Sequence, residues 1–103
     1  LICVSDGSNG STFVTANANA SHPSYSVETV DATGAGDAFL ASVAWLLSSS
    51  EKKINDLSSD DLLSMAAFSN AAGALVATKL GAMEADFTQI DVKRLLSSGR
   101  IIF

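Results

Sequence analysis

The sequence predicts an α/β or α+β fold in which short strands come first and helices follow. Two short segments rich in β-branched and apolar residues flank a cluster of turn-forming residues near the start of the chain. A long apolar segment and then a segment with leucine and alanine at helical spacing come after them. The length of 103 residues fits one small domain, and a hydrophobic content of 48% is typical of a globular protein.

The first part of the chain is predicted to be β structure. Residues 1–5 form an apolar strand, residues 6–10 (DGSNG) form a turn, and residues 11–16 form the returning strand. The Asn-Gly pair that ends this turn is a strong hairpin signal. The segment ANANASHPS is predicted as a polar loop, and residues 24–30 as another extended piece.

The second part of the chain is predicted to be helical. Residues 37–49 are apolar almost all the way round a helix, which predicts a buried helix rather than an amphipathic surface helix. The polar segment SSSEKKINDLSS is predicted as a loop, and the serines and aspartates at its end are good N-caps for a second helix. Gly81 is predicted to end this second helix, and a last short helix is expected over residues 89–96.

Charge and residue content exclude several classes of function. The net charge is −5, which argues against a nucleic acid or an anionic membrane as the partner. No apolar run approaches the roughly 20 residues of a membrane span. Cys3 is the only cysteine, which excludes an internal disulfide and indicates a reducing, cytoplasmic compartment. His22 is the only histidine and lies beside Pro23, so neither a catalytic triad nor a histidine-based metal site is expected.

The chain starts at Leu1 in an apolar segment, with no charged region before it and no cleavage site after it. A signal peptide would have both of these features. We therefore expect the chain to begin inside a longer protein. In that case the apolar residues 1–4 and 38–47 are expected to be covered by a larger sheet, and to be exposed without it.

The segment VDATGAGDAF carries the chemistry that the sequence suggests. Gly34, Ala35 and Gly36 lead into the N-terminus of the helix predicted to begin near Asp37. Small residues let a ligand approach the backbone, and the first N–H groups of a helix have no internal partner, so the segment can bind an anion. A carboxylate at Asp37 could then accept a proton from an attacking hydroxyl. The alternative from the spacing alone is a strand-to-helix turn in which Asp37 only caps the helix.

Two common phosphate-binding motifs do not match this segment. A Walker phosphate loop requires Lys and then Ser or Thr after its second glycine, where this chain has Asp37 and Ala38. The dinucleotide-binding fingerprint requires a third glycine where this chain has Phe39.

Three blocks of the sequence together resemble one family. VDATGAGDAF resembles the C-terminal signature of the ribokinase-like sugar kinases, the PfkB carbohydrate kinase family, whose usual form is DTTGAGD. ICVSDGSNG resembles the strand and nucleotide loop that precede this signature, and SNAAGALVATKLGA resembles the helix and loop that close over the adenine. The blocks occur in the family's order, span residues 1–96, and look most like fructokinases.

The resemblance implies an α/β, ribokinase-like three-layer fold, of which residues 1–103 would be the C-terminal nucleotide-binding portion. It also implies ATP-dependent phosphorylation of a sugar hydroxyl. Asp37 matches the catalytic base of the family, and Gly34, Ala35 and Gly36 match the anion hole at the transferred phosphate. The positions that match the nucleotide site are Ser5, Gly7, Gly10, Gly36 and Asn70.

The resemblance also implies cations and partners. Asp31 and Thr33 match positions that help to bind a monovalent cation, usually potassium, and backbone carbonyls near Val76, Lys79 and Gly81 would complete that site. Magnesium would accompany ATP, since a metal ion must neutralise phosphate charge. A sugar is the expected substrate, and a homodimeric parent protein is one expectation.

This chain departs from the family's pattern at Ala32, which replaces a threonine, and at Ser5, which replaces another. It also lacks the proline that often follows residues 81–82, near the positions that match the potassium site. The family's sugar-binding residues belong to its N-terminal half, which this chain does not contain. Two alternatives therefore stay open: a non-catalytic nucleotide-binding or truncated fragment, and a kinase of the same family that acts on ribose, a nucleoside or 2-keto-3-deoxygluconate.

Overall fold

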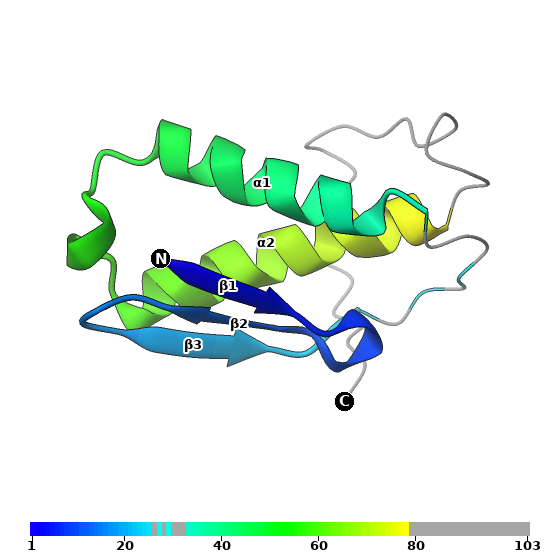
Figure 1. Ribbon diagram of the computed structural model, residues 1–103, viewed down its shortest axis with the longest axis horizontal. Helices are drawn as coiled ribbons and strands as arrows, with labels where there is room; N and C mark the ends of the chain where they lie inside the picture. Colours follow the sequence, from blue (N-terminus) through cyan, green and yellow to red (C-terminus); the bar gives the residue numbers. More distant parts are fainter. Residues whose placement is uncertain (26, 28, 30–32, 79–103) are drawn as a thin grey trace.

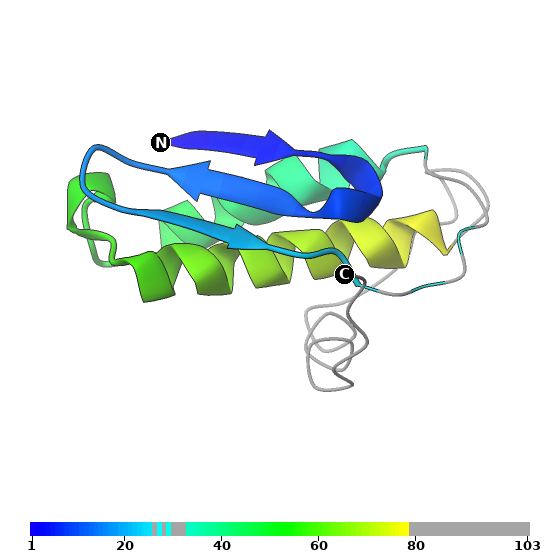
Figure 2. The ribbon, with the colours of Figure 1, turned by 90° about the horizontal axis from the view of Figure 1, so that it is seen from below.

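Three antiparallel strands and two helices make up the part of the chain that the computed structural model describes, residues 1–25, 27, 29 and 33–78. The strands β1 (Ile2–Ser5), β2 (Ser11–Val14) and β3 (Asn19–His22) form a sheet in the order β1-β2-β3. The helices α1 (Ala35–Ser49) and α2 (Ser59–Ala77) lie side by side on one face of this sheet (Figure 1, Figure 2).

The register of the sheet places one row of side chains against the helices. Cys3, Phe13 and Ala20 are cross-strand neighbours, and all three pack in the main core. Because side chains alternate between the faces of a strand, Ile2 and Val4 lie on the opposite face, where they are 64% and 55% exposed. Phe13, at 0% exposure, is the largest fully buried side chain of the described residues.

The core lies between this row and the facing sides of the two helices. Phe13 meets Phe39 of α1 edge to face, with ring centroids 5.8 Å apart. Such aromatic contacts contribute about 0.5–1.5 kcal/mol beyond the area that they bury. The other buried members of this cluster are Val43, Leu57, Leu62, Met65 and Ala66.

Several predicted boundaries are wrong. β3 lies inside the segment predicted as a polar loop, because its backbone pairs with β2 and the hydroxyls of Thr12 and Ser21 lie 2.8 Å apart across the pair. α1 begins at Ala35, two residues before the predicted start. α2 ends at Ala77 rather than at Gly81, with Thr78 as its C-cap. Gly81 and the helix predicted over residues 89–96 lie outside the described residues.

The prediction that α1 is buried all round is also wrong for the described part of the chain. Phe39 and Val43 face the core, while Leu40 is 66% exposed and Trp45 is 44% exposed. Leu40 and Trp45 of α1, like Ile2 and Val4 on the outer face of β1, are thus exposed. The short 3-10 turn Ile54–Asp56 lies in the connection between the two helices, which was predicted as a loop.

A reciprocal pair of hydrogen bonds starts α2. The Ser58 hydroxyl accepts from the Asp61 N–H at 3.1 Å, and the Asp61 carboxylate accepts from the Ser58 N–H at 2.9 Å. Lys52 Nζ donates to the same carboxylate at 2.7 Å. The hydrogen bond from Lys52 and then those from Ser58 lower the pKa of Asp61 from 3.8 to about 2.

This capping box predicts a pH-dependent contribution to stability. Because the pKa of Asp61 is lowered in the folded chain, its contribution is complete above pH 3.8 and is lost as the pH falls toward about 2. Thermal unfolding should therefore separate wild type from Asp61→Asn near neutral pH, and the two midpoints should converge between these pH values. Asp60→Asn, in the same helical turn, is the control. A difference between wild type and Asp61→Asn that is independent of pH would contradict this role.

Gly10, which ends the loop between β1 and β2, sits against the backbone of a distant segment. Its φ of 93° and ψ of −146° lie in a region that only glycine populates readily. A Cβ at this position would collide with the carbonyl oxygen of His22 and lie 2.8 Å from the Cα of Pro23. Gly7, with a φ of 49°, has no atom within 4 Å of the corresponding position.

These two glycines provide a matched pair of substitutions. We expect Gly10→Ala to lower the free energy of unfolding by about 3 kcal/mol or more. The cost of the backbone conformation for alanine and the cost of the collision with the His22 carbonyl both contribute to this decrease. Gly7→Ala should cost about 1–2 kcal/mol, since only the left-handed conformation opposes it. Denaturant titration of both variants measures the free energy of unfolding. Equal decreases in the two variants would show that the packing against His22 and Pro23 does not restrict Gly10.

Candidate functional site

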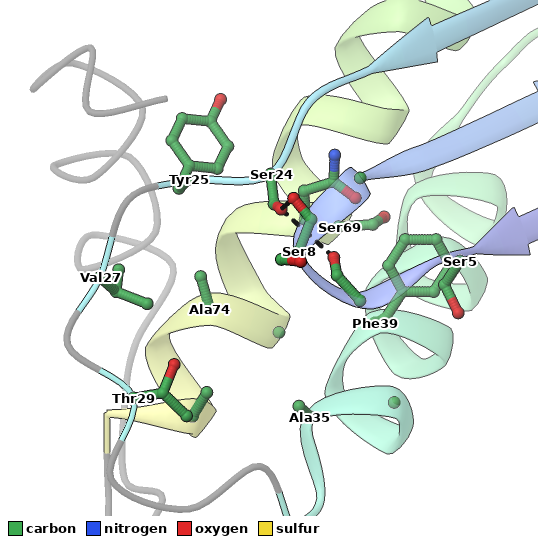
Figure 3. A pocket seen from close by; sticks show the side chains of 16 residues that line it. Ser5, Ser8, Ser24, Tyr25, Val27, Thr29, Ala35, Phe39, Ser69 and Ala74 are labelled. Atoms are coloured by element: carbon green, nitrogen blue, oxygen red, sulfur yellow. Dashed lines mark hydrogen bonds between the residues drawn. The ribbon is translucent and has the colours of Figure 1, made fainter. Parts of the chain in front are cut away.

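A cavity of about 250 Å³ opens where the loop after β1, the start of α1 and one face of α2 meet (Figure 3). Its volume is near the lower limit of ordinary small-molecule pockets, about 300 Å³. No charged side chain occurs among the described residues that line it. The lining residues are Ser5, Gly7, Ser8, Gly10, Ser24, Tyr25, Val27, Thr29, Ala35, Gly36, Phe39, Ser69, Asn70, Gly73, Ala74 and Ala77.

The loop between β1 and β2 forms the first wall. It contains the 3-10 turn Gly7–Asn9 and is closed by backbone hydrogen bonds from Asp6 N to Gly10 O and from Asn9 N to Asp6 O, each 2.8 Å long. The Asn9 side chain donates to the Asp6 carboxylate at 3.2 Å. These bonds within the loop hold a compact backbone with little side-chain bulk against the cavity.

The start of α1 forms the second wall. Gly34 is the N-cap, with a φ of 83° in the left-handed region, and its carbonyl accepts the first helical bond from Ala38 N at 3.0 Å. The N–H groups of Ala35, Gly36 and Asp37 therefore have no partner within the helix. A Cβ at Gly36 would point into open space, so this helix terminus is unobstructed. Unpaired N–H groups and the helix dipole together favour an anion here.

One face of α2 forms the third wall. Asn70, Gly73, Ala74 and Ala77 recur at helical spacing, and all of them line the cavity. A Cβ at Gly73 would lie 3.2 Å from the carbonyl oxygen of Ala35, so the absence of a side chain lets the two helices approach at the cavity. Ala35 and Ala74 face the same space from opposite sides (Figure 3).

Asn70 has a structural partner as well as a place in this wall. Its side-chain amide donates to the backbone carbonyls of His22 at 3.0 Å and Pro23 at 3.2 Å. The residue is only 8% exposed. The amide nitrogen is thus engaged in holding the chain that follows β3.

The structure brings together many of the residues that the sequence singled out. Those that line the cavity are Ser5, Gly7, Gly10, Ala35, Gly36 and Asn70. Gly34 lies directly beside them as the N-cap of α1. Asp37 follows Gly36 in the first turn of α1, is exposed, and is not among the lining residues.

The residues predicted for the potassium site are placed only in part. Thr33 is exposed just before the N-cap of α1, and Val76 is buried near the end of α2 at 3% exposure. Asp31, Lys79 and Gly81 lie outside the described residues. Across the described ranges, no group of three or more His, Cys, Asp or Glu side chains is arranged to hold a metal ion, and no helix is long and apolar enough to cross a membrane.

Sequence reasoning did not identify several residues of the cavity. Gly73, Ala74 and Ala77 could have been found from their helical spacing from Asn70. Ser69 and Ser24 gave no such signal, because serine occurs throughout this sequence. Ser69 is fully buried, and its hydroxyl has no hydrogen-bond partner within the described part of the chain. Ser24 is buried and bonded to the loop that forms the first wall.

The same three segments occur in known proteins. Residues 1–89 match the pfkB family of carbohydrate kinases. Fructokinase-2 of Oryza sativa subsp. japonica is 37% identical over 97 residues, which cover 94% of this chain and 28% of that protein. Fructokinase-2 of Zea mays is 38% identical over 85 residues, which cover 82% of this chain and 25% of that protein. The chain thus spans less than a third of these relatives.

Solved structures share the fold. A fructokinase from Xylella fastidiosa with bound ATP superposes with a TM-score of 0.83 and 25% identity, over 93% of this chain and 31% of that one. A fructokinase from Vibrio cholerae O395, solved with fructose, ADP and a calcium ion, gives a TM-score of 0.77 and 31% identity, over 91% of this chain and 30% of that one. The described α/β elements are therefore part of a ribokinase-like fold. With both the sequence match and the shared fold, the chain belongs to the pfkB family of carbohydrate kinases.

Proposed function

We propose that this chain is the C-terminal, nucleotide-binding portion of a sugar kinase, over residues 1–103, and that the whole protein transfers a phosphoryl group from ATP to a hydroxyl of a fructose-like sugar. One observation carries the proposal. Three segments that are far apart in the sequence, the loop after β1, the start of α1 and one face of α2, line a single cavity. The fructokinases that match this chain, one of which was solved with ATP, support the assignment.

The cavity suits the phosphate end of a nucleotide. ATP supplies the transferable phosphoryl group, whose oxygens carry the charge that the protein must stabilise. In our proposal Gly34, Ala35 and Gly36 form the anion hole, and the N–H groups at the start of α1 donate to those oxygens. Ser5, Gly7 and Gly10 contact the nucleotide from the first wall, and Asn70 borders it from α2. Among the described residues, no atom lies within 4 Å of the position that a Cβ at Gly36 would occupy, which leaves space for a ligand beside it.

Asp37 is proposed as the general base. Its place in the first turn of α1, directly after Gly36, sets a carboxylate beside the proposed anion hole. Its exposure leaves it accessible to a hydroxyl that a sugar-binding part of the protein would present. The carboxylate would accept the proton of that hydroxyl as the oxygen attacks the phosphorus. The sugar itself would be held by residues outside this chain.

Two cations belong to the proposal. Mg²⁺ would enter with ATP and neutralise phosphate charge, since the described lining residues include no Lys or Arg. A potassium ion would be held by Asp31 and Thr33 with carbonyls near Val76, Lys79 and Gly81. The fructokinase from Vibrio cholerae O395 was solved with a calcium ion, which supports including a cation in the proposal.

Gly36 offers a direct test of the anion hole. Gly36→Val, made in the full-length kinase, adds a side chain where no atom of the described residues lies within 4 Å, so it should leave the fold intact while blocking phosphate approach. We expect turnover to fall about a hundred- to a thousandfold, the effect of losing one transition-state donor. Gly36→Ala should give a smaller loss of the same kind. Unfolding midpoints of both variants are the control, and unchanged turnover with ATP would contradict the proposed hole.

Asp37→Asn tests the base in the same protein. Removing a general base should lower kcat by about a hundred- to ten-thousandfold while ATP–Mg still binds. The matched control is Asp56→Asn, at an exposed carboxylate that does not line the cavity.

Phosphorylation of fructose, ribose and a nucleoside by the wild-type protein at fixed ATP, measured by ADP release, identifies the substrate class. Near-normal turnover of Asp37→Asn would contradict the proposed role, and ATP binding by wild type without turnover of any sugar would instead favour a non-catalytic nucleotide-binding fragment.

A further inference from the structure

The segment of residues 22–25, which we call the strap, passes between the loop after β1 and helix α2. It begins at His22, the last residue of β3, and Ser24 and Tyr25 line the cavity. Gly10 of the loop packs so closely on the strap that a Cβ there would collide with the His22 carbonyl oxygen. The strap is therefore in direct contact with the part of the cavity that the proposal assigns to the nucleotide.

Ser24 joins the strap to the loop. Its side-chain hydroxyl donates to the backbone carbonyl of Ser8 at 2.5 Å and lies 3.2 Å from that of Gly7 (Figure 3). A hydroxyl has a single proton, so it donates to one carbonyl at a time, and the bond to Ser8 is the shorter. The Gly7 carbonyl also accepts from the Gly10 N–H at 3.2 Å. Ser24 is only 9% exposed, so little water can replace this donor.

The other side of the strap is joined to α2. The side-chain amide of Asn70 donates to the carbonyls of His22 and Pro23, at 3.0 and 3.2 Å. The Tyr25 ring stacks on the His22 ring, with centroids 5.5 Å apart, and packs against Ala71 and Ala72 of α2. The strap is thus held by α2 on one side, and Ser24 connects it to the loop on the other.

We propose that Ser24, whose hydroxyl is engaged with the carbonyls of Gly7 and Ser8, is a positioning residue that acts on the nucleotide through the backbone of this loop. Peptide units are planar, so holding the two carbonyl oxygens also fixes the orientation of the peptide groups that carry them. Gly7 and Gly10 both have positive φ, and glycine has more accessible conformations than other residues, so Ser24 adds a restraint from outside to the hydrogen bonds within the loop. This inference rests on the proposed function of the cavity.

The expected consequence is a change in affinity rather than in chemistry. If the loop adopts its binding conformation only part of the time, the apparent affinity equals the intrinsic affinity multiplied by the fraction of time spent in that conformation. The bound state is unaltered. Loss of one hydrogen bond of ordinary net strength should weaken binding of ATP–Mg by about three- to tenfold. The turnover number at saturating ATP should stay unchanged, because Ser24 touches no reacting atom in this scheme.

The experiment compares wild type, Ser24→Ala and Ser21→Ala in the full-length kinase. Calorimetry gives the Kd for ATP–Mg, and steady-state kinetics separate the KM for ATP from kcat. Ser21→Ala is the control, because within the described part of the chain the Ser21 hydroxyl bonds across β2 and β3, to Thr12, and makes no hydrogen bond to the loop. Hydrogen exchange of the loop amides of Asn9 and Gly10 should accelerate in Ser24→Ala, with no change in the interior of α2.

The outcomes separate this inference from the function on which it rests. A raised KM with unchanged kcat, together with faster exchange confined to the loop, supports the positioning role. Wild-type binding with an unchanged KM in Ser24→Ala would overturn the role of Ser24 and leave the kinase assignment standing. No binding of ATP–Mg by wild type would overturn both. If Ser24→Ala does not fold, Ser24→Cys keeps the volume with a weaker donor, and the same split between KM and kcat decides.

Discussion

The edge-to-face contact between Phe13 and Phe39 is the interaction on which the arrangement of the cavity depends. Phe13 is fully buried in the central strand, and Phe39 lies one helical turn after Ala35. Packing of the two rings therefore fixes the first turn of α1 over the end of the sheet where the strands β1 and β2 are joined. Replacing either ring would displace the second wall of the cavity as well as the core.

The cavity is formed from backbone and small side chains rather than from charge. Glycine at 73 lets α2 approach the carbonyl of Ala35, and glycine at 36 leaves the helix terminus open. A chain with a net charge of −5 has no surplus of cationic groups for phosphate, and the described lining supplies none. In the proposed function, the fixed N–H donors at the start of α1 would meet this need without side-chain rearrangement, which is the condition under which such donors are most effective in catalysis.

Asn70 lines the cavity and also makes hydrogen bonds that the sequence did not predict. The resemblance put it on the helix that borders the nucleotide, and the structure does place it in the cavity wall. Its amide nitrogen, however, holds the carbonyls of His22 and Pro23. One helix thus both lines the cavity and anchors the segment that supports the opposite wall, so changes at Asn70 would affect the two together.

The sequence by itself determined the strand-turn-strand start, the two main helices and the three blocks that line the cavity, because turn chemistry, helical periodicity and motif order are local properties of the chain. Only the tertiary structure decided the rest. β3 forms from polar residues because a neighbouring strand satisfies its backbone, and one side of α1 is exposed because the sheet of the described chain covers only the other. The place of Ser24 beneath the loop of Gly7 and Ser8 was likewise invisible in the sequence, since residues 16 and 17 positions apart meet only when the sheet folds back on itself.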